Sequence, residues 1–234
     1  LDHHWQKGTW VNMVDCYITA TEFSRQKLVT AGIPPHKIPV KPNYVYPEGR
    51  YDQKNQRKYA LYVGRLSREK GVDILLKAWE GLRDIPLKIM GEGPLAGELK
   101  DYTQKRNMHH VEFLGYLSQE GYDACMKEAK FIVVPSVCYE NFPRIIAEAY
   151  AYSVPILASR LGTLTELIKE NETGLLFESG SPEDLAQKVR WLYGHEGELE
   201  KMSQLARWEY EEKYAAERNY AFLMDIYRRT IESY

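Results

Sequence analysis

The sequence contains no apolar run close to the roughly 20 residues that a membrane-spanning helix requires, so we expect no transmembrane segment. Its first residues, LDHHWQKGTW, contain no apolar core of a signal peptide. An excess of charge of one sign is also missing, because 31 Lys and Arg against 33 Asp and Glu give a net charge of −2. The sequence therefore offers no global basic surface for nucleic acid or for anionic lipid.

Cysteine is scarce: Cys16, Cys125 and Cys138 are an odd number, and none lies in a C-x-x-C spacing. This usage favours buried, reduced thiols in a cytosolic protein over a disulfide framework. The sequence also lacks a D-x-D motif and any other metal-ligand cluster, so we expect no bound metal. The paired histidines at 3–4 and 109–110 are interpreted as surface residues. No G-x-G-x-x-G follows a predicted strand, which argues against a Rossmann oxidoreductase.

The sequence does contain a regular alternation of strand-length and helix-length segments. Its 234 residues, 44% hydrophobic and 27% charged, can bury a sizeable core. Apolar runs predict strands at 59–63, 87–90, 111–114, 131–134, 155–159 and 174–177, and the segments between them predict helices at 72–82, 94–106, 118–129, 143–152 and 182–193. The alternation predicts an α/β fold with a doubly wound, Rossmann-like parallel sheet. Ligands of such sheets bind beyond the carboxyl ends of the strands.

Two further segments flank this alternation, which we assign to a main domain at 57–210. Residues 1–56 comprise a predicted strand at 14–21, a helix at 22–33, an extended segment at 37–46 and most of a polar stretch at 48–58 that is interpreted as a linker. Residues 211–234 predict a terminal helix with one apolar face, formed by Leu223, Ile226, Tyr227 and Ile231. A coiled-coil partner helix is the alternative for this tail. The chain begins without Met and within a structural pattern, so we expect it to be a piece of a longer protein.

Cations follow the first strand of the alternation. Gly64 permits a tight turn, and Arg65, Arg68 and Lys70 come after it, where the next helix begins. Fixed cations beside a helix N-terminus are suited to binding phosphate, although a solvated charged loop would have the same composition.

Two glutamates, Glu140 and Glu148, stand eight residues apart after the fourth strand. Pro143 predicts a helix that begins near Asn141, so Glu140 precedes the helix and Glu148 lies on its second turn. The carboxylates could bind two parts of one extended ligand, and the free N–H groups at the helix start would face that ligand. The alternatives are a capping role for Glu140 and a satisfied structural carboxylate for Glu148.

A strand-to-helix turn after the fifth strand carries Gly162 and Thr163, with Glu166 three residues further on. This spacing predicts a capping box, in which Thr163 caps the helix and Glu166 reaches back to it.

The segments GRLSREKG, GEGP, VEFLGYLS, YENFPRIIAEAYA, GTLTEL and TGLLF, in this order, resemble the carboxyl-terminal domain of the family-four retaining glycosyltransferases. Those enzymes have the GT-B architecture, in which two Rossmann-like domains face a cleft. The resemblance covers roughly residues 57 to 234, and residues 1–56 resemble the end of the first, acceptor-binding domain. It implies that the terminal helix crosses back toward that first domain.

The resemblance also implies roles for individual residues. Arg65 and Lys70 match the basic pair that holds the diphosphate of a nucleotide sugar, next to the turn at Gly64. Glu140 matches the glutamate that contacts hydroxyls of the transferred sugar, and Glu148 matches the one that binds the ribose. Arg65, Lys70 and Glu140 are therefore the implied catalytic residues.

Further contacts with the substrate are implied around this set. The loop facing the sugar and the phosphate would be formed by Asn141, Phe142 and Pro143; the turn lining the base by Gly115, Tyr116 and Leu117; and a turn near the diphosphate by Thr163. The family often has two glycines where this chain has Gly162 and Thr163, and the side chain of Thr163 narrows this turn.

The resemblance implies a metal-independent hexosyltransferase of polysaccharide biosynthesis, located in the cytoplasm, which moves a sugar with retention from a nucleotide diphosphate sugar to a glycan or other small acceptor. No cofactor besides this donor substrate and no nucleic-acid partner is implied, and a peripheral membrane contact through the missing domain is left open. We expect the chain alone to transfer little or no sugar. A non-catalytic nucleotide-binding interaction module is the alternative, and a glycosidase with paired carboxylates is a weaker rival.

Overall fold

The computed structural model describes residues 2–46 and 57–232. The predicted linker therefore lies outside the described residues, except at its last two positions. Among the described residues, no helix combines the length and apolarity needed to cross a membrane.

Six parallel strands form one sheet in the order β3-β2-β1-β4-β5-β6. The strands are β1 (Tyr59–Val63), β2 (Leu87–Met90), β3 (Val111–Gly115), β4 (Ala129–Val134), β5 (Ile156–Ser159) and β6 (Gly174–Phe177). This arrangement confirms the predicted doubly wound parallel sheet. The order reverses between β1 and β4, the neighbours at the centre of the sheet, and ligands of open α/β sheets bind in the crevice at such a reversal.

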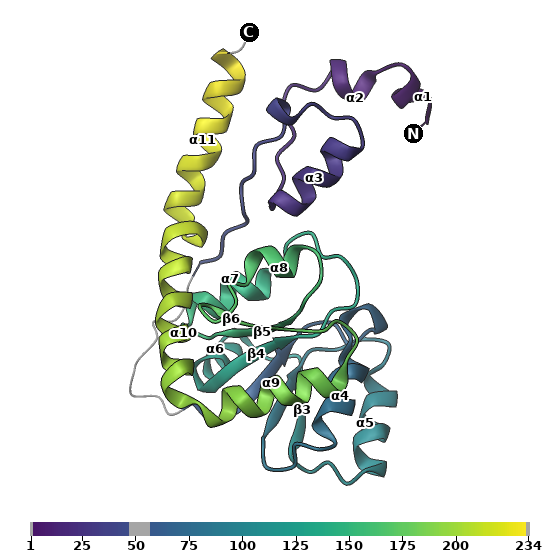
Figure 1. Ribbon diagram of the computed structural model, residues 1–234, viewed down its shortest axis with the longest axis vertical. Helices are drawn as coiled ribbons and strands as arrows, with labels where there is room; N and C mark the ends of the chain where they lie inside the picture. The colour runs from purple at the N-terminus through teal and green to yellow at the C-terminus, as the bar shows by residue number, and fades with distance from the viewer. Residues whose placement is uncertain (1, 47–56, 233–234) are drawn as a thin grey trace.

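Helices cover both faces of the sheet, as Figure 1 shows. One face carries α4 (Val72–Trp79), α5 (Ala96–Lys105) and α9 (Pro182–Gly194), and the other carries α6 (Gln119–Glu128), α7 (Arg144–Ala151) and α8 (Thr163–Leu167). The predicted helices between the strands are confirmed, with ends that differ by at most three residues.

The two layers of core arise from the alternation of side chains along each strand. In β1, Ala60 and Tyr62 pack under α4 and α9, whereas Leu61 packs on the opposite face with α7. Every residue of β4 except Lys130 is buried, as expected for a central strand of a parallel sheet. The sheet is therefore a rigid platform for the loops that leave its carboxyl edge.

The amino-terminal segment contains α1 (Asp2–Gln6), α2 (Thr9–Asn12), α3 (Glu22–Thr30) and the short 3-10 helix η1 (Pro35–Lys37). The prediction of a strand at 14–21 is wrong, because Thr19 makes only an isolated parallel bridge with Val40. Tyr17 N–H donates to Lys37 O, and Thr19 exchanges hydrogen bonds with Pro39 O and the Lys41 N–H, but Pro39 has no N–H to donate to Tyr17 O, so no continuous ladder forms. The helix predicted at 22–33 is confirmed as the shorter α3.

The tail consists of α10 (Glu196–Glu209), a π-helical turn at Tyr210–Tyr214 and α11 (Ala216–Glu232). In Figure 1, α11 rises beside the extended segment that precedes residue 47. Asn219 fastens the helix there, because its buried amide donates to Pro42 O and accepts from Lys41 Nζ (2.6 Å). The apolar face predicted for this helix is only partly covered: Leu223 and Ile226 are half-buried, whereas Tyr227 and Ile231 are 50% and 73% exposed.

The cysteines are free thiols, as predicted, but Cys16, Cys125 and Cys138 are half-buried, so the expectation of fully buried thiols is wrong. Burial raises the pKa of the Cys125 thiol. Burial, and then the negative charge of the nearby Glu140 carboxylate, raise the pKa of the Cys138 thiol. A raised pKa keeps both thiols protonated and unreactive at neutral pH.

Candidate functional site

A tight contact between two loops fixes the cationic turn after β1. Gly71, with φ +67°, ends the 3-10 turn η2 (Arg68–Lys70), and a Cβ on it would lie 1.9 Å from the carbonyl oxygen of Pro135. Val137 N–H donates to Glu69 O at 3.0 Å across the same boundary. Because Gly71 has no side chain, the loop after β1 lies directly on the loop after β4.

This contact brings Lys70 to Glu140. Lys70 Nζ lies 2.5 Å from Glu140 Oε1, and the Ser136 hydroxyl donates to the same oxygen at 2.7 Å. The Glu140 side chain is 14% exposed and the Lys70 side chain is 30% exposed, so the ion pair is largely shielded from water. Arg65 is exposed and makes no ion pair within residues 2–46 and 57–232. The cluster therefore joins a cation and a carboxylate at the switch point, and the second cation, Arg65, comes from the same loop after β1.

The loop before α7 presents backbone donors. Neither the N–H of Asn141 nor that of Phe142 has an acceptor in the described part of the chain. The helix begins at Arg144 with Pro143 as its N-cap, so the prediction of a start near Asn141 is wrong by three residues. The cause is the extended backbone of Pro143 (ψ 107°). The Phe142 ring points into the core, 5.8 Å from the ring centroid of Tyr214, so only its backbone can meet a ligand.

Glu148 lies on the second turn of α7, as predicted. The Tyr122 hydroxyl donates to its Oε2 at 2.7 Å, and Arg144 lies 3.5 Å from its Oε1. The Glu148 side chain is 27% exposed. Burial, and then the neighbouring Glu148 carboxylate, raise the pKa of Tyr122. Tyr122 therefore stays protonated and orients the carboxylate as a hydrogen-bond donor.

A pocket of about 420 Å³ lies at the carboxyl ends of β1, β2 and β3. Five residues predicted from the sequence line it: Gly64, Arg65, Gly115, Tyr116 and Leu117. Tyr122 and Gln119 also line it, and both also line a second hollow of about 320 Å³ that contains Glu148. The pocket that contains Gly115 and Tyr116 and the hollow that contains Glu148 thus lie side by side, on either side of Tyr122.

The glycines of the GEGP turn have a packing role at this pocket. Gly91 has φ +133°, and a Cβ on it would lie 2.0 Å from Gly64 O, while a Cβ on Gly93 would lie 2.4 Å from Leu66 O. Because both glycines lack side chains, the turn after β2 can lie against the turn after β1.

The capping box predicted for Thr163 and Glu166 is wrong. Gly162, with φ +52°, is the N-cap of α8, which places Thr163 at the first helical position. The fully buried Thr163 hydroxyl instead donates to Glu140 O at 2.8 Å, and the Glu166 carboxylate accepts hydrogen bonds from the first turn of α3. The side chain of Thr163 therefore supports the site loop, and only its backbone can meet a phosphate.

Sequence reasoning missed Tyr122 and Ser136 as members of the site. Both donate to a glutamate that was predicted: Ser136 lies four residues before Glu140 in the same loop, whereas Tyr122 lies 26 residues before Glu148 and meets it only through the fold. Tyr122 had one usable signal, since it follows the GYLS turn by one helical turn.

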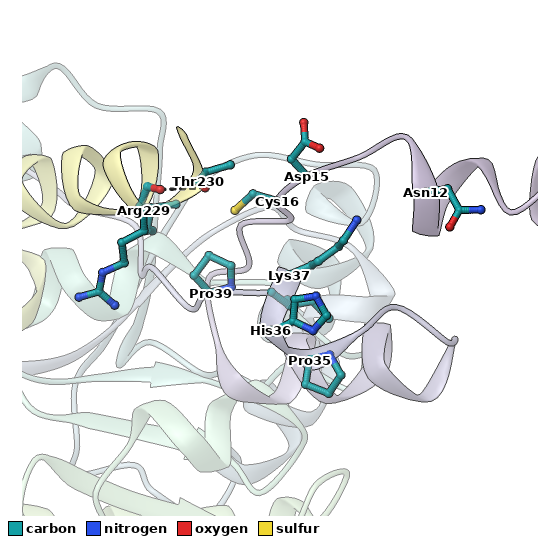
Figure 2. Close-up of a pocket in the computed structure, with 11 residues that line it drawn as sticks. Asn12, Asp15, Cys16, Pro35, His36, Lys37, Pro39, Arg229 and Thr230 are labelled. Carbon is teal, nitrogen blue, oxygen red and sulfur yellow. Dashed lines mark hydrogen bonds between the residues drawn. The ribbon is translucent and has the colours of Figure 1, made fainter. Parts of the chain in front are cut away.

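A larger pocket, of about 660 Å³, lies away from the strand ends, between the amino-terminal segment and α11. Figure 2 shows its lining, which includes Asp15, Cys16, His36 and Arg229. None of the predicted site residues lines it. Within the described residues, no group of three or more His, Cys, Asp or Glu side chains could hold a metal ion.

Comparison with known proteins gives a consistent family. The family model described as "Glycosyl transferases group 1" matches residues 49–208. An uncharacterized glycosyltransferase of Methanocaldococcus jannaschii is 35% identical over 65% of this chain and 41% of its own length. D-rhamnosyltransferase WbpZ of Pseudomonas aeruginosa is 33% identical over 68% of this chain and 42% of its own. The chain thus spans about half the length of the curated relatives it matches.

Solved structures share the fold. A glycosyltransferase from Rickettsia africae has a TM-score of 0.86 at 20% identity, over 100% of this chain and 69% of its own. Anabaena HepE in complex with UDP has a TM-score of 0.83 at 18% identity, over 94% of this chain and 64% of its own.

Proposed function

The chain belongs to the glycosyl transferases group 1 family, and from this premise we propose that its strand-edge site binds a nucleotide diphosphate sugar whose sugar is transferred to an acceptor. The observation that carries the proposal is the cluster of Lys70, Glu140 and Ser136 at the switch point of the sheet, beside a pocket of about 420 Å³ that includes Arg65. An extended donor needs these features in a row: a slot for the base, a carboxylate for the ribose, cations for the diphosphate and a carboxylate for the sugar.

The proposed chemistry follows from charge. When the bond from the anomeric carbon to the diphosphate breaks, negative charge grows on the leaving phosphate oxygen. Fixed cations at Arg65 and Lys70, together with the backbone N–H groups of Asn141 and Phe142, stabilise that charge more in the transition state than in the ground state. We assign Glu140 to the sugar hydroxyls and not to nucleophilic attack, because Lys70 and Ser136 already hold its Oε1.

We further propose that the transfer proceeds with retention and without a metal ion. Retention rests on the resemblance to the family-four enzymes, and metal independence rests on the two cations placed where a metal would otherwise balance the diphosphate. Product analysis by NMR, which reads the anomeric configuration before it equilibrates, tests retention. An inverted product would contradict it.

We propose a glycan or other small acceptor, in a polysaccharide pathway of the cytoplasm. Relatives bear names such as O-antigen chain mannosyltransferase C of Escherichia coli, which supports the pathway. The three free thiols support a reducing compartment. HepE of Anabaena was solved with UDP and glucose, which makes UDP the first nucleotide to test.

A thermal unfolding screen tests the donor class. We expect one nucleoside diphosphate among UDP, GDP and ADP to stabilise the chain by about 2.7 kcal/mol when present at about 100 times its Kd, because it binds only the folded state. The matching nucleotide sugar should do the same, whereas inorganic phosphate at the same concentration should not. Equal stabilisation by phosphate, or none by any nucleotide, would contradict the proposal.

A further inference from the structure

The carboxylate of Glu166, in α8, lies against the first turn of α3, a helix 144 residues away in the sequence. Its Oε1 accepts the N–H of Glu22 at 2.8 Å, and its Oε2 accepts the N–H of Phe23 at 2.7 Å. The first N–H groups of a helix have no partners within the helix, and Thr21 Oγ1 supplies one only for Ser24 (3.2 Å). Glu166 therefore completes the cap of α3 from a distant segment.

The same turn of α3 lies against the loop that carries the candidate site. Ser24 Oγ donates to Asn141 Oδ1 at 3.1 Å, and the ring centroid of Phe23 lies 5.0 Å from that of Tyr139. Lys27 Nζ lies 5.2 Å from both ring centroids. A Cβ on Gly162 would lie 2.7 Å from the Tyr139 ring and 3.1 Å from the Phe23 ring, so little free space remains here. Figure 1 shows α3 above α8.

Two side chains of α8 thus act on the loop around Glu140. Thr163 acts directly, through its bond to Glu140 O, and Glu166 acts indirectly, because it fixes the turn of α3 that contacts Tyr139 and Asn141. Within the described residues, Glu166 forms no hydrogen bond or ion pair with Lys70 or Glu140.

We propose that Glu166 is a positioning residue for the donor site, which holds α3 against the loop 139–142 so that the Glu140 carboxylate faces the transferred sugar. This inference rests on the proposed function. Both carboxylate oxygens are used, each on one of two consecutive N–H groups, and the negative charge lies at the positive end of α3. A glutamine has a single acceptor oxygen and can serve only one of the two N–H groups.

The test compares two ligands in variants of the chain. Kd is measured by calorimetry for the stabilising nucleoside diphosphate and for the matching nucleotide sugar, with Glu166→Ala and Glu166→Gln. We expect Glu166→Ala to weaken the nucleotide sugar at least fivefold and Glu166→Gln to weaken it less, while the free diphosphate changes less than twofold for both. A purely structural role would lower the melting temperature but leave this ratio of affinities unchanged.

Glu172→Ala is the matched control, because Glu172 is an exposed carboxylate in the turn that follows α8; it should change neither ligand. If Glu166→Ala does not fold, Ser24→Ala removes only the hydroxyl bonded to Asn141, and it should weaken the nucleotide sugar at least twofold. Equal losses for both ligands, or no loss for either, would overturn the inference alone. Binding of neither ligand by the unaltered chain would overturn the proposed function, and this inference with it.

Discussion

Glu140 and Glu148 come from one short segment, yet their surroundings differ. One carboxylate oxygen of Glu140 accepts hydrogen bonds from Lys70 and Ser136 at the switch point. Glu148 accepts a hydrogen bond from Tyr122, which lines the same pocket as Gly115. If Glu140 contacts the sugar and Glu148 the ribose, the two substitutions will have different effects on the binding of two ligands that differ only in the sugar.

Glu148→Ala should therefore weaken the nucleoside diphosphate and the nucleotide sugar alike, by tenfold or more, because a hydrogen bond to a charged group contributes about 1.5–3 kcal/mol. Glu140→Ala should leave the free diphosphate nearly unchanged and remove the extra affinity that the sugar confers. Calorimetry on variants with unchanged circular dichroism measures both. Equal effects of the two substitutions would show that the assignment of roles is wrong.

Tyr122 provides a second residue-scale prediction. Tyr122→Phe keeps the ring but removes the hydroxyl that orients Glu148, so both ligands should bind roughly threefold to tenfold more weakly. Tyr220→Phe, on the exposed surface of α11, is the control and should bind as the unaltered chain does. An unchanged Kd in Tyr122→Phe would mean that Glu148 is oriented by its other neighbours.

The residues of the site were more predictable than their partners. The sequence shows cations after one strand and glutamates after another. We expect these residues to lie close together because parallel strands bring their carboxyl ends to one edge. The direct contact of Lys70 with Glu140 was not predicted, since it depends on Gly71 lying on Pro135. The prediction that Thr163 caps α8 was wrong, although its spacing from Glu166 is that of a capping box. Gly162 is the N-cap instead, and the spacing does not reveal the positive φ that this residue adopts.

At the scale of elements, the turn η2 depends on Gly71. Gly71→Ala puts a Cβ 1.9 Å from Pro135 O on a residue with φ +67°, so the free energy of unfolding should fall by at least about 2 kcal/mol. The melting temperature should fall by roughly 4–8 °C. Gly97→Ala, in α5, meets open space and should raise the stability by up to about 1 kcal/mol. Unfolding in denaturant measures both, and equal stability of the two variants would contradict the packing described here.

Elements with strong internal patterns were predicted well, and those that depend on a neighbour were not. The six strands from β1 to β6 follow from apolar runs, which are buried on both faces in the central strands and only partly buried in the edge strand β3. The segment 14–21 has the same kind of composition, but the neighbour at Val40 lies between proline-bearing positions and pairs through one bridge only. The short helix α8 was expected from its turn, although its cap was assigned to the wrong residue.

At the scale of the whole molecule, two faces of one sheet support a single edge. Core residues on both faces fix β1 and β4, the loops after these two strands carry the cations and Glu140, and α7 carries Glu148. The segment at α3 and the helix α8 then hold the loop 139–142 from outside the sheet. We therefore expect the binding of a nucleotide sugar to depend on side chains of the loops after β1 and β4, which the fold holds in place before the ligand binds.

The most direct test is a calorimetric titration, in EDTA, of the chain with the nucleoside diphosphate that stabilises it. We expect binding to persist in EDTA, and Lys70→Ala to weaken it at least tenfold, because the diphosphate then meets Glu140 without its cation. Lys77→Ala, which removes an exposed cation on α4 that pairs with Asp73, should change Kd less than twofold. Loss of binding on chelation would contradict the metal-free site, and equal Kd values for Lys70→Ala and the unaltered chain would contradict its placement at the switch point.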